Sequence, residues 1–161
     1  MFETNSRMPL AAQASEFLSA SPCLIAALSN LSALLYHSLP ELNWAGFYLI
    51  HEGNLVVGPF SGKPACISIP LSKGVCGAAV RGNRIQRVAD VHAFPGHIAC
   101  DSASRSEIVI PIHREGRIVG VPDIDSPIEN RFSEEDERLL QSVVDALEAS
   151  TVWETPAYTL V

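Results

Sequence analysis

Three of the four cysteines are the residues of this chain best placed to do chemistry. Cys66 lies at a predicted strand end, Cys76 in a glycine-rich turn and Cys100 in a long loop, where a thiol can be reached. Cys23 instead lies beside the apolar stripe of an amphipathic helix, so we expect it to be buried. Accessible thiols within one domain suit two chemistries, thiol–disulfide exchange and zinc binding.

The spacing of the three cysteines favours redox chemistry over zinc. Zinc ligands usually come in close pairs, whereas nine and twenty-three residues lie between successive cysteines, with His92 and His97 as the only loop histidines. A redox pair needs only a thiolate that attacks an electrophile and a second thiol that reaches it afterwards. Unreactive thiols and a zinc-binding structural module stay as alternatives, because reactivity depends on thiol pKa and exposure.

Four acidic residues strengthen the redox interpretation. Asp123 and Asp125 occupy alternate positions of a predicted strand and share one face, and Glu107 opens the partner strand. With Asp101 they could gather near Cys100, although isolated acids on strands are usually solvated. Crowded carboxyl groups raise one another's pKa, so one of them can stay protonated near neutrality and act as a general acid.

Two aromatic residues indicate either a core or a binding wall. Trp44 and Tyr48 are four residues apart in a predicted strand and therefore share a face, with Gly46 between them. Aromatic packing in a sheet core is the simpler interpretation. The functional one is an apolar wall for a small ligand that Gly46 allows to approach.

The elements that would position these residues follow from periodicity and turn signals. Helices are expected in residues 1–20, from Leu24 with Ser21 as its cap and Pro22 in its first turn, and after the capping residue Ser133. Two hairpins, a short strand, a short helix and an aperiodic loop lie between: Asn43–Ile50 with Leu55–Phe60, Glu107–Ile112 with Arg117–Asp125, Cys66–Pro70, Gly74–Val80 and Val91–Ser104. Pro122 lacks a backbone donor, so we expect an edge strand or a bulge there. The order predicts an α+β fold, a central antiparallel sheet with the N- and C-terminal helices packed on one face.

Length and composition restrict the class of protein. A chain of 161 residues, 47% apolar and 18% charged, suits one domain over residues 1–161 with a frayed tail over residues 154–161. A formal net charge of -7 disfavours nucleic acid as a partner. We expect a cytoplasmic protein without a membrane partner, because no apolar run reaches the roughly 18 residues of a membrane span and no secretory signal opens the chain. Its leucine-rich terminal helices would suit a homodimer.

The long loop and several flanking motifs resemble one known family. The segment Asp90–Ser104 is similar to the signature loop of the free methionine-(R)-sulfoxide reductases, which are built on a GAF-type domain. Further motifs match in order from about Leu42 to the final helix: Asn43–Tyr48, Gly58–Phe60, Ala65–Cys66, Lys73–Gly77, Ser106–Val109 and Asp123–Pro127. Pro122 departs from the pattern, since the family usually has an aliphatic residue there. A proline cannot donate a ladder hydrogen bond, so we expect it to shift the strand and the direction of the Asp123 side chain.

The resemblance implies reduction of free L-methionine-(R)-sulfoxide to methionine, with no bound cofactor and no metal. Cys100 would attack the sulfoxide sulfur and become a sulfenic acid, and Cys66 would resolve it as a disulfide. Cys76 would be a second or substitute resolving thiol. Thioredoxin, itself reduced by NADPH and thioredoxin reductase, would be the electron donor that resets the enzyme.

The resemblance also assigns the residues that bind substrate. Glu107, Asp123 and Asp125 would bind the substrate amine and assist at the sulfoxide oxygen, and Trp44 and Tyr48 would surround the substrate methyl group. An acidic pocket suits an ammonium group, and an indole face suits a small apolar group.

Two questions stay open at the level of sequence. Carboxylates near Cys100 should raise its pKa, so a substrate ammonium, His97 or backbone donors must offset them. A GAF-type sensor that binds a small molecule and signals to a partner is the alternative function, because a fold alone does not fix function.

Overall fold

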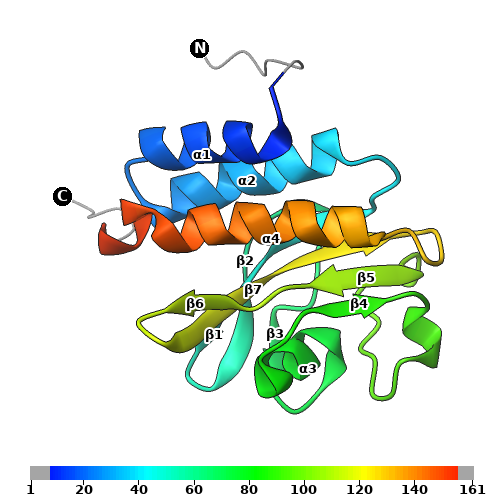
Figure 1. The fold of residues 1–161 in the computed structure, drawn as a ribbon. Helices are drawn as coiled ribbons and strands as arrows, with labels where there is room; N and C mark the ends of the chain where they lie inside the picture. Colours follow the sequence, from blue (N-terminus) through cyan, green and yellow to red (C-terminus); the bar gives the residue numbers. More distant parts are fainter. Residues whose placement is uncertain (1–7, 156–161) are drawn as a thin grey trace.

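One antiparallel sheet with helices on both faces forms the framework of the computed structural model, which describes residues 8–155 (Figure 1). The elements, in chain order, are α1 (Leu10–Ala20), α2 (Leu24–Ser38), β1 (Trp44–His51), β2 (Asn54–Gly62), β3 (Ser68–Pro70), α3 (Gly74–Gly82), β4 (Gln86–Val88), η1 (Val91–Ala93), β5 (Ser106–Val109), β6 (Ile112–Arg114), β7 (Arg117–Ser126), α4 (Glu134–Ala149) and η2 (Thr151–Glu154). Helices α1, α2 and α4 cover one face of the sheet, and α3 lies on the other (Figure 1). The predicted α+β fold with the terminal helices on one face is confirmed, and α3 adds a cover to the second face.

The strands run in the order β3-β2-β1-β7-β5-β4, with β6 also paired to β7. Both predicted hairpins are present, β1 with β2 and β6 with β7. The predicted strand over residues 107–112 divides into β5 and β6, which both pair with β7. The register is continuous from Val109, opposite Asp123, to Ile112, opposite Gly120, and it shifts between Ile112 and His113. Strand β7 therefore lies at the centre of the sheet.

Pro122 lies in the middle of β7, so the predicted edge strand is wrong. It pairs with Phe47 of β1 in a register that runs through it without a shift, so the predicted bulge is wrong as well. Its carbonyl accepts a hydrogen bond of 3.3 Å from the Ile110 amide. The N and C=O of one strand residue point to the same neighbouring strand. The missing N–H therefore removes one ladder bond from β7 to Ile110, which lies between β5 and β6, and the pairing with β1 is intact.

The helical face of the sheet holds the larger of two apolar clusters, built from α1, α2, α4 and residues of the central strands. Helix α4 begins with Ser133 as its cap, as predicted, and Asp136 completes a capping box with it. Helix α2 begins at Leu24 with Cys23 at its N-cap, so the predicted Ser21 cap is wrong. The Ser21 hydroxyl instead donates to the Phe17 carbonyl at the end of α1. Cys23 is buried, as expected.

The chain continues past α4 in one further helical turn. Residues Thr151–Glu154 form η2, which packs near α1, and the remainder of the predicted frayed tail, residues 156–161, lies outside the described residues. Within residues 8–155 no helix combines the length and apolar character that crossing a membrane would require.

Candidate active site

Two of the three candidate cysteines are joined in a disulfide. Cys66, in the loop before β3, is bonded to Cys100, in the loop before β5, with their Cα atoms 5.4 Å apart. The Tyr48 hydroxyl holds the first loop by donating a 3.0 Å hydrogen bond to the Cys66 carbonyl. The second loop is tied to the start of α3, where the Gly74 amide donates to the Gly96 carbonyl at 3.1 Å. The structure thus brings together two thiols that are 34 residues apart in sequence.

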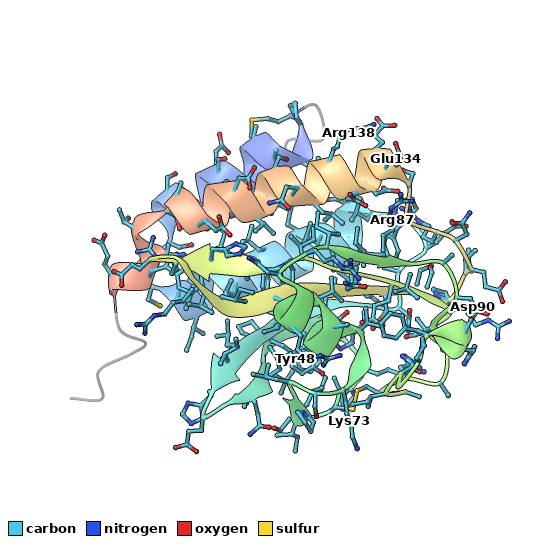
Figure 2. The ribbon with its side chains drawn as sticks, turned by 60° about the horizontal axis from the view of Figure 1, so that its bottom comes forward. Tyr48, Lys73, Arg87, Asp90, Glu134 and Arg138 are labelled. Carbon is cyan, nitrogen blue, oxygen red and sulfur yellow. A yellow bond between two sulfur atoms is a disulfide. The ribbon has the colours of Figure 1, made fainter. Side chains whose placement is uncertain are left out.

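Three neighbouring strands deliver acidic and aromatic side chains to one face of the sheet. Glu107 of β5 pairs with Asp125 of β7, which pairs in turn with Trp44 of β1. Asp123, two residues before Asp125, pairs with Gly46. Side chains at directly paired and alternate positions lie on the same face. Glu107, Asp123 and Asp125, hereafter the acid cluster, therefore face α3 and the loop of Cys100, on the side where Tyr48 and Lys73 lie and opposite the side of Glu134 and Arg138 (Figure 2).

Burial sets the protonation of the acid cluster. Glu107 and Asp123 are only 6% and 7% exposed, and one oxygen of Asp123 has no hydrogen-bond partner. Burial raises the pKa of Asp123 to about 6. Burial, followed by the charge of Asp123 as the next cause, raises the pKa of Glu107 and of Asp125 well above the usual range. The cluster therefore holds protons near neutral pH, as a general acid requires.

Cys76 lies beneath the acid cluster as a buried free thiol. Its sulfur donates to a Glu107 carboxylate oxygen 3.9 Å away. Burial and then the charges of Asp123 and Glu107 raise the pKa of the Cys76 thiol well above its usual range. This environment disfavours a thiolate, although the predicted role of Cys76 as a second resolving thiol stays a prediction.

The aromatic wall contains a third ring that the sequence did not single out. Trp44 stacks on Tyr48 and on Phe60, with ring centroids 5.8 and 5.2 Å apart, and the first two residues are buried. A Cβ atom on Gly46 would lie 2.3 Å from the Phe60 Cβ and 2.6 Å from a Trp44 ring carbon. The expectation that Gly46 makes room for a ligand is therefore wrong, since Trp44 and Phe60 fill that space.

Two small cavities lie between the acid cluster and the disulfide. One, of about 30 Å³, extends toward Cys76, His97 and Ile98, and the other, of about 20 Å³, reaches Trp44 and Tyr48. Both are lined by Cys100, Asp101, Asp123 and Asp125. A single water needs roughly 10–15 Å³ measured in this way. Each cavity thus has room for a water or two, and an amino acid needs this disulfide-closed site to open.

The structure contains side chains that could bind a cation, but they are not the three cysteines considered for a zinc site. The Cys66–Cys100 disulfide removes two of the thiolates that such a zinc site would use. Among residues 8–155, the ligand-type side chains close enough to share a cation are Cys76, Glu107 and Asp123, whose ligand atoms lie within 4.8 Å of one another. The carboxylate of Asp123, whose pKa of about 6 leaves it ionised at neutral pH, also suits a substrate ammonium. The expectation that no metal is bound stays a prediction.

A larger hollow, between α1 and α2, lies away from this chemistry. Its volume is about 620 Å³, and its lining includes Phe17, Leu34 and His37 but no cysteine and no carboxylate. The site lined by Cys100 is therefore much smaller than this hollow and separate from it. Its lining residues come from positions between Trp44 and Asp125.

An antiparallel sheet with α3 and a disulfide-bonded loop on one face defines the class of protein. Residues 8–150 match the GAF domain family model. The free methionine-R-sulfoxide reductase of Escherichia coli is 56% identical over 124 residues, which are 77% of this chain and 75% of that protein. The structure of free methionine-R-sulfoxide reductase from Neisseria meningitidis in complex with its substrate is 39% identical with a TM-score of 0.83, covering 86% of this chain and 84% of that one. A putative GAF sensor protein from Burkholderia vietnamiensis is 52% identical with a TM-score of 0.84, covering 88% and 90%.

The chain belongs to the free methionine-R-sulfoxide reductase family of GAF domains. The family resemblance stated from the sequence is confirmed by this result. The protein from Burkholderia vietnamiensis has the same fold and a similar sequence identity, but it is named a putative GAF sensor.

Proposed function

We propose that this protein reduces free L-methionine-(R)-sulfoxide to methionine. The observation that carries the proposal is the Cys66–Cys100 disulfide beside a buried acid cluster that holds protons near neutral pH. The names of the relatives from Escherichia coli and Neisseria meningitidis support the same activity.

The first step uses the reduced enzyme. The Cys100 thiolate attacks the sulfoxide sulfur, while Glu107 or Asp125 gives a proton to the sulfoxide oxygen. The S–O bond breaks, the oxygen is transferred to Cys100 as a sulfenic acid, and methionine leaves. Trp44 and Tyr48 pack against the substrate methyl group, and Asp123 pairs with its ammonium.

The second step forms the disulfide seen in the structure. The Cys66 sulfur attacks the Cys100 sulfenic acid, an S–S bond forms, and the oxygen leaves as water. A dithiol then reduces the disulfide and is itself oxidised. We propose thioredoxin as this dithiol, reduced in turn by thioredoxin reductase and NADPH, which suits a cytoplasmic enzyme. A homodimer through the terminal helices remains a prediction.

A thioredoxin-coupled assay of NADPH consumption tests the proposal. Wild type should consume NADPH with the (R) epimer of free methionine sulfoxide, and not with the (S) epimer or a sulfoxide-containing peptide. Cys100→Ser should lose turnover, whereas Cys23→Ser, which removes a free thiol buried at the start of α2, should keep it. Folded wild type without turnover, and with ligand binding that survives Cys100→Ser, would instead establish the sensor.

A further inference from the structure

One amide side chain holds the loop of Cys100 to the sheet. Asn43, the residue before β1, donates through Nδ2 to the Asp101 carboxylate at 3.2 Å and to the Ser104 hydroxyl at 2.9 Å. Its backbone amide donates to the Asp125 carbonyl at 3.0 Å. Asn43 thus joins the strand of Asp125 to both ends of the short segment that follows Cys100. We call Asn43, Asp101 and Ser104 the loop clamp.

The loop clamp also reaches toward the loop of Cys66. One oxygen of Asp101 accepts from the Ala103 amide at 2.9 Å, and the other lies 3.9 Å from the Lys63 ammonium, three residues before Cys66. Lys63 is 74% exposed, so this ion pair contributes little by itself. The two hydrogen bonds of the Asn43 amide are partly buried, and one of them ends on the buried Ser104, so they are the contacts expected to fix the loop.

The Asn43 amide uses only its donor side. Its Oδ1 atom is buried and has no hydrogen-bond partner. A buried unpaired acceptor costs stability, and the two hydrogen bonds from Nδ2 to the loop of Cys100 offset that cost. Asn43 does not line either cavity at the disulfide, so any effect on the reaction passes through Asp101 and Ser104, which do.

We infer that Asn43 is a positioning residue for disulfide formation: through Asp101 and Ser104 it holds the Cys100 sulfur where the Cys66 sulfur can reach it. The inference rests on the proposed function, in which this disulfide closes the catalytic cycle. Holding two reacting groups in place raises their effective concentration. If the loop were mobile, Cys66 would attack the Cys100 sulfenic acid more slowly. The reduced pair of thiols would also form the disulfide less readily.

Asn43→Ala tests the inference, because it removes the amide and keeps the backbone bond to Asp125. The disulfide equilibrium is measured in dithiothreitol redox buffers without substrate. We expect the equilibrium constant for Cys66–Cys100 formation to fall about tenfold, which is about 30 mV. Ser104→Ala removes one of the two acceptors and should give a smaller change, about threefold. Asn54→Ala, at the start of β2, is the matched control and should match wild type.

Single-turnover kinetics give a second readout that a loss of general stability would not move selectively. Asn43→Ala should release methionine within about twofold of the wild-type rate and close the disulfide about tenfold more slowly. A wild-type disulfide equilibrium in Asn43→Ala and Ser104→Ala would overturn the inference. If Asn43→Ala does not fold, Ser104→Ala alone decides. Absence of methionine formation in wild type would refute the proposed function and leave the substrate-free equilibrium to judge the loop clamp.

Discussion

Replacing Asp123 by Asn should stabilise the fold at neutral pH while it removes activity. The Asp123 side chain is buried beside Glu107, and one of its oxygens lacks a partner. Burial raises its pKa from 3.8 to about 6. Ionised Asp123 is therefore less stable in the folded protein than in the unfolded chain. Asn has nearly the same shape and no charge to bury.

The magnitude follows from proton linkage. Between pH 3.8 and about 6 the folded protein binds a proton that the unfolded chain has lost, so the free energy of unfolding falls as the pH rises. The fall is about 1.4 kcal/mol per pH unit, or about 3 kcal/mol in total, and it is complete above the folded pKa. Below pH 3.8 both states are protonated and the contribution is fully present. Sharing of protons within the acid cluster reduces the expected advantage of Asp123→Asn to about 1–3 kcal/mol at pH 7.5, with almost none at pH 4.

Urea unfolding of the disulfide form at pH 4, 5.5 and 7.5, followed by tryptophan fluorescence, measures this advantage. Asp145→Asn is the control, because Asp145 is exposed on α4 and its change should show no such pH dependence. An advantage of Asp123→Asn that is equal at all three values, or a variant less stable than wild type at pH 7.5, would refute the argument. Turnover of the sulfoxide by the same variant should fall by about 10²-fold or more.

Three further substitutions test the packing around the site. Pro122→Leu restores a backbone N–H that can donate to the Ile110 carbonyl, so turnover should stay equal or rise. A large loss of turnover in a steady-state assay would show that the proline shapes the site. Gly46→Ala pushes a Cβ into Phe60, so urea unfolding should show a loss of about 1–3 kcal/mol, and an unchanged midpoint would count against the described contact. Cys76→Ser keeps a hydrogen-bond donor, so kcat should stay within about threefold, under ~1 kcal/mol; loss of disulfide recycling would instead make Cys76 a required thiol.

The sequence predicted helices, strands and turns correctly where interactions between residues close in sequence determine the structure. The alternation of Asp123 and Asp125 placed both on one face, and the serine before the acidic turn of α4 formed its capping box. The hairpin of β1 and β2 followed from its turn. In each case the deciding interactions lie within a few residues.

The remaining features depend on which strands become neighbours. Pro122 was expected at an edge because a proline removes a ladder bond, but β5 and β1 enclose β7 from distant parts of the chain. The same enclosure brings Trp44 beside Asp125. Asn43 reaches Asp101 across 58 residues, and no periodicity signals such a contact. The pairing of Cys66 with Cys100 followed from the family resemblance, not from spacing.

The charge on Asp101 bears on the thiolate that the proposed function requires at Cys100. Hydrogen bonds from Ala103 and Asn43 lower the pKa of Asp101, so it is an anion next to Cys100, the proposed nucleophile. The same donors partly neutralise that charge. His97 does not provide the counter-charge, because partial burial lowers its pKa and leaves it neutral.

The acid cluster adds less negative charge near Cys100 than its three carboxyl groups suggest. Burial raises the pKa values of Glu107, Asp123 and Asp125, so bound protons replace much of the negative charge that would oppose a Cys100 thiolate. In the proposed reaction, the same protons are the ones that the departing sulfoxide oxygen takes up. Turnover of the reduced enzyme should therefore rise with thiol ionisation and then fall once the cluster loses its protons, giving a bell-shaped profile of kcat/KM with a dithiol reductant. A profile that only rises toward alkaline pH would show that the proton comes from elsewhere, and the acid cluster would then serve substrate binding alone.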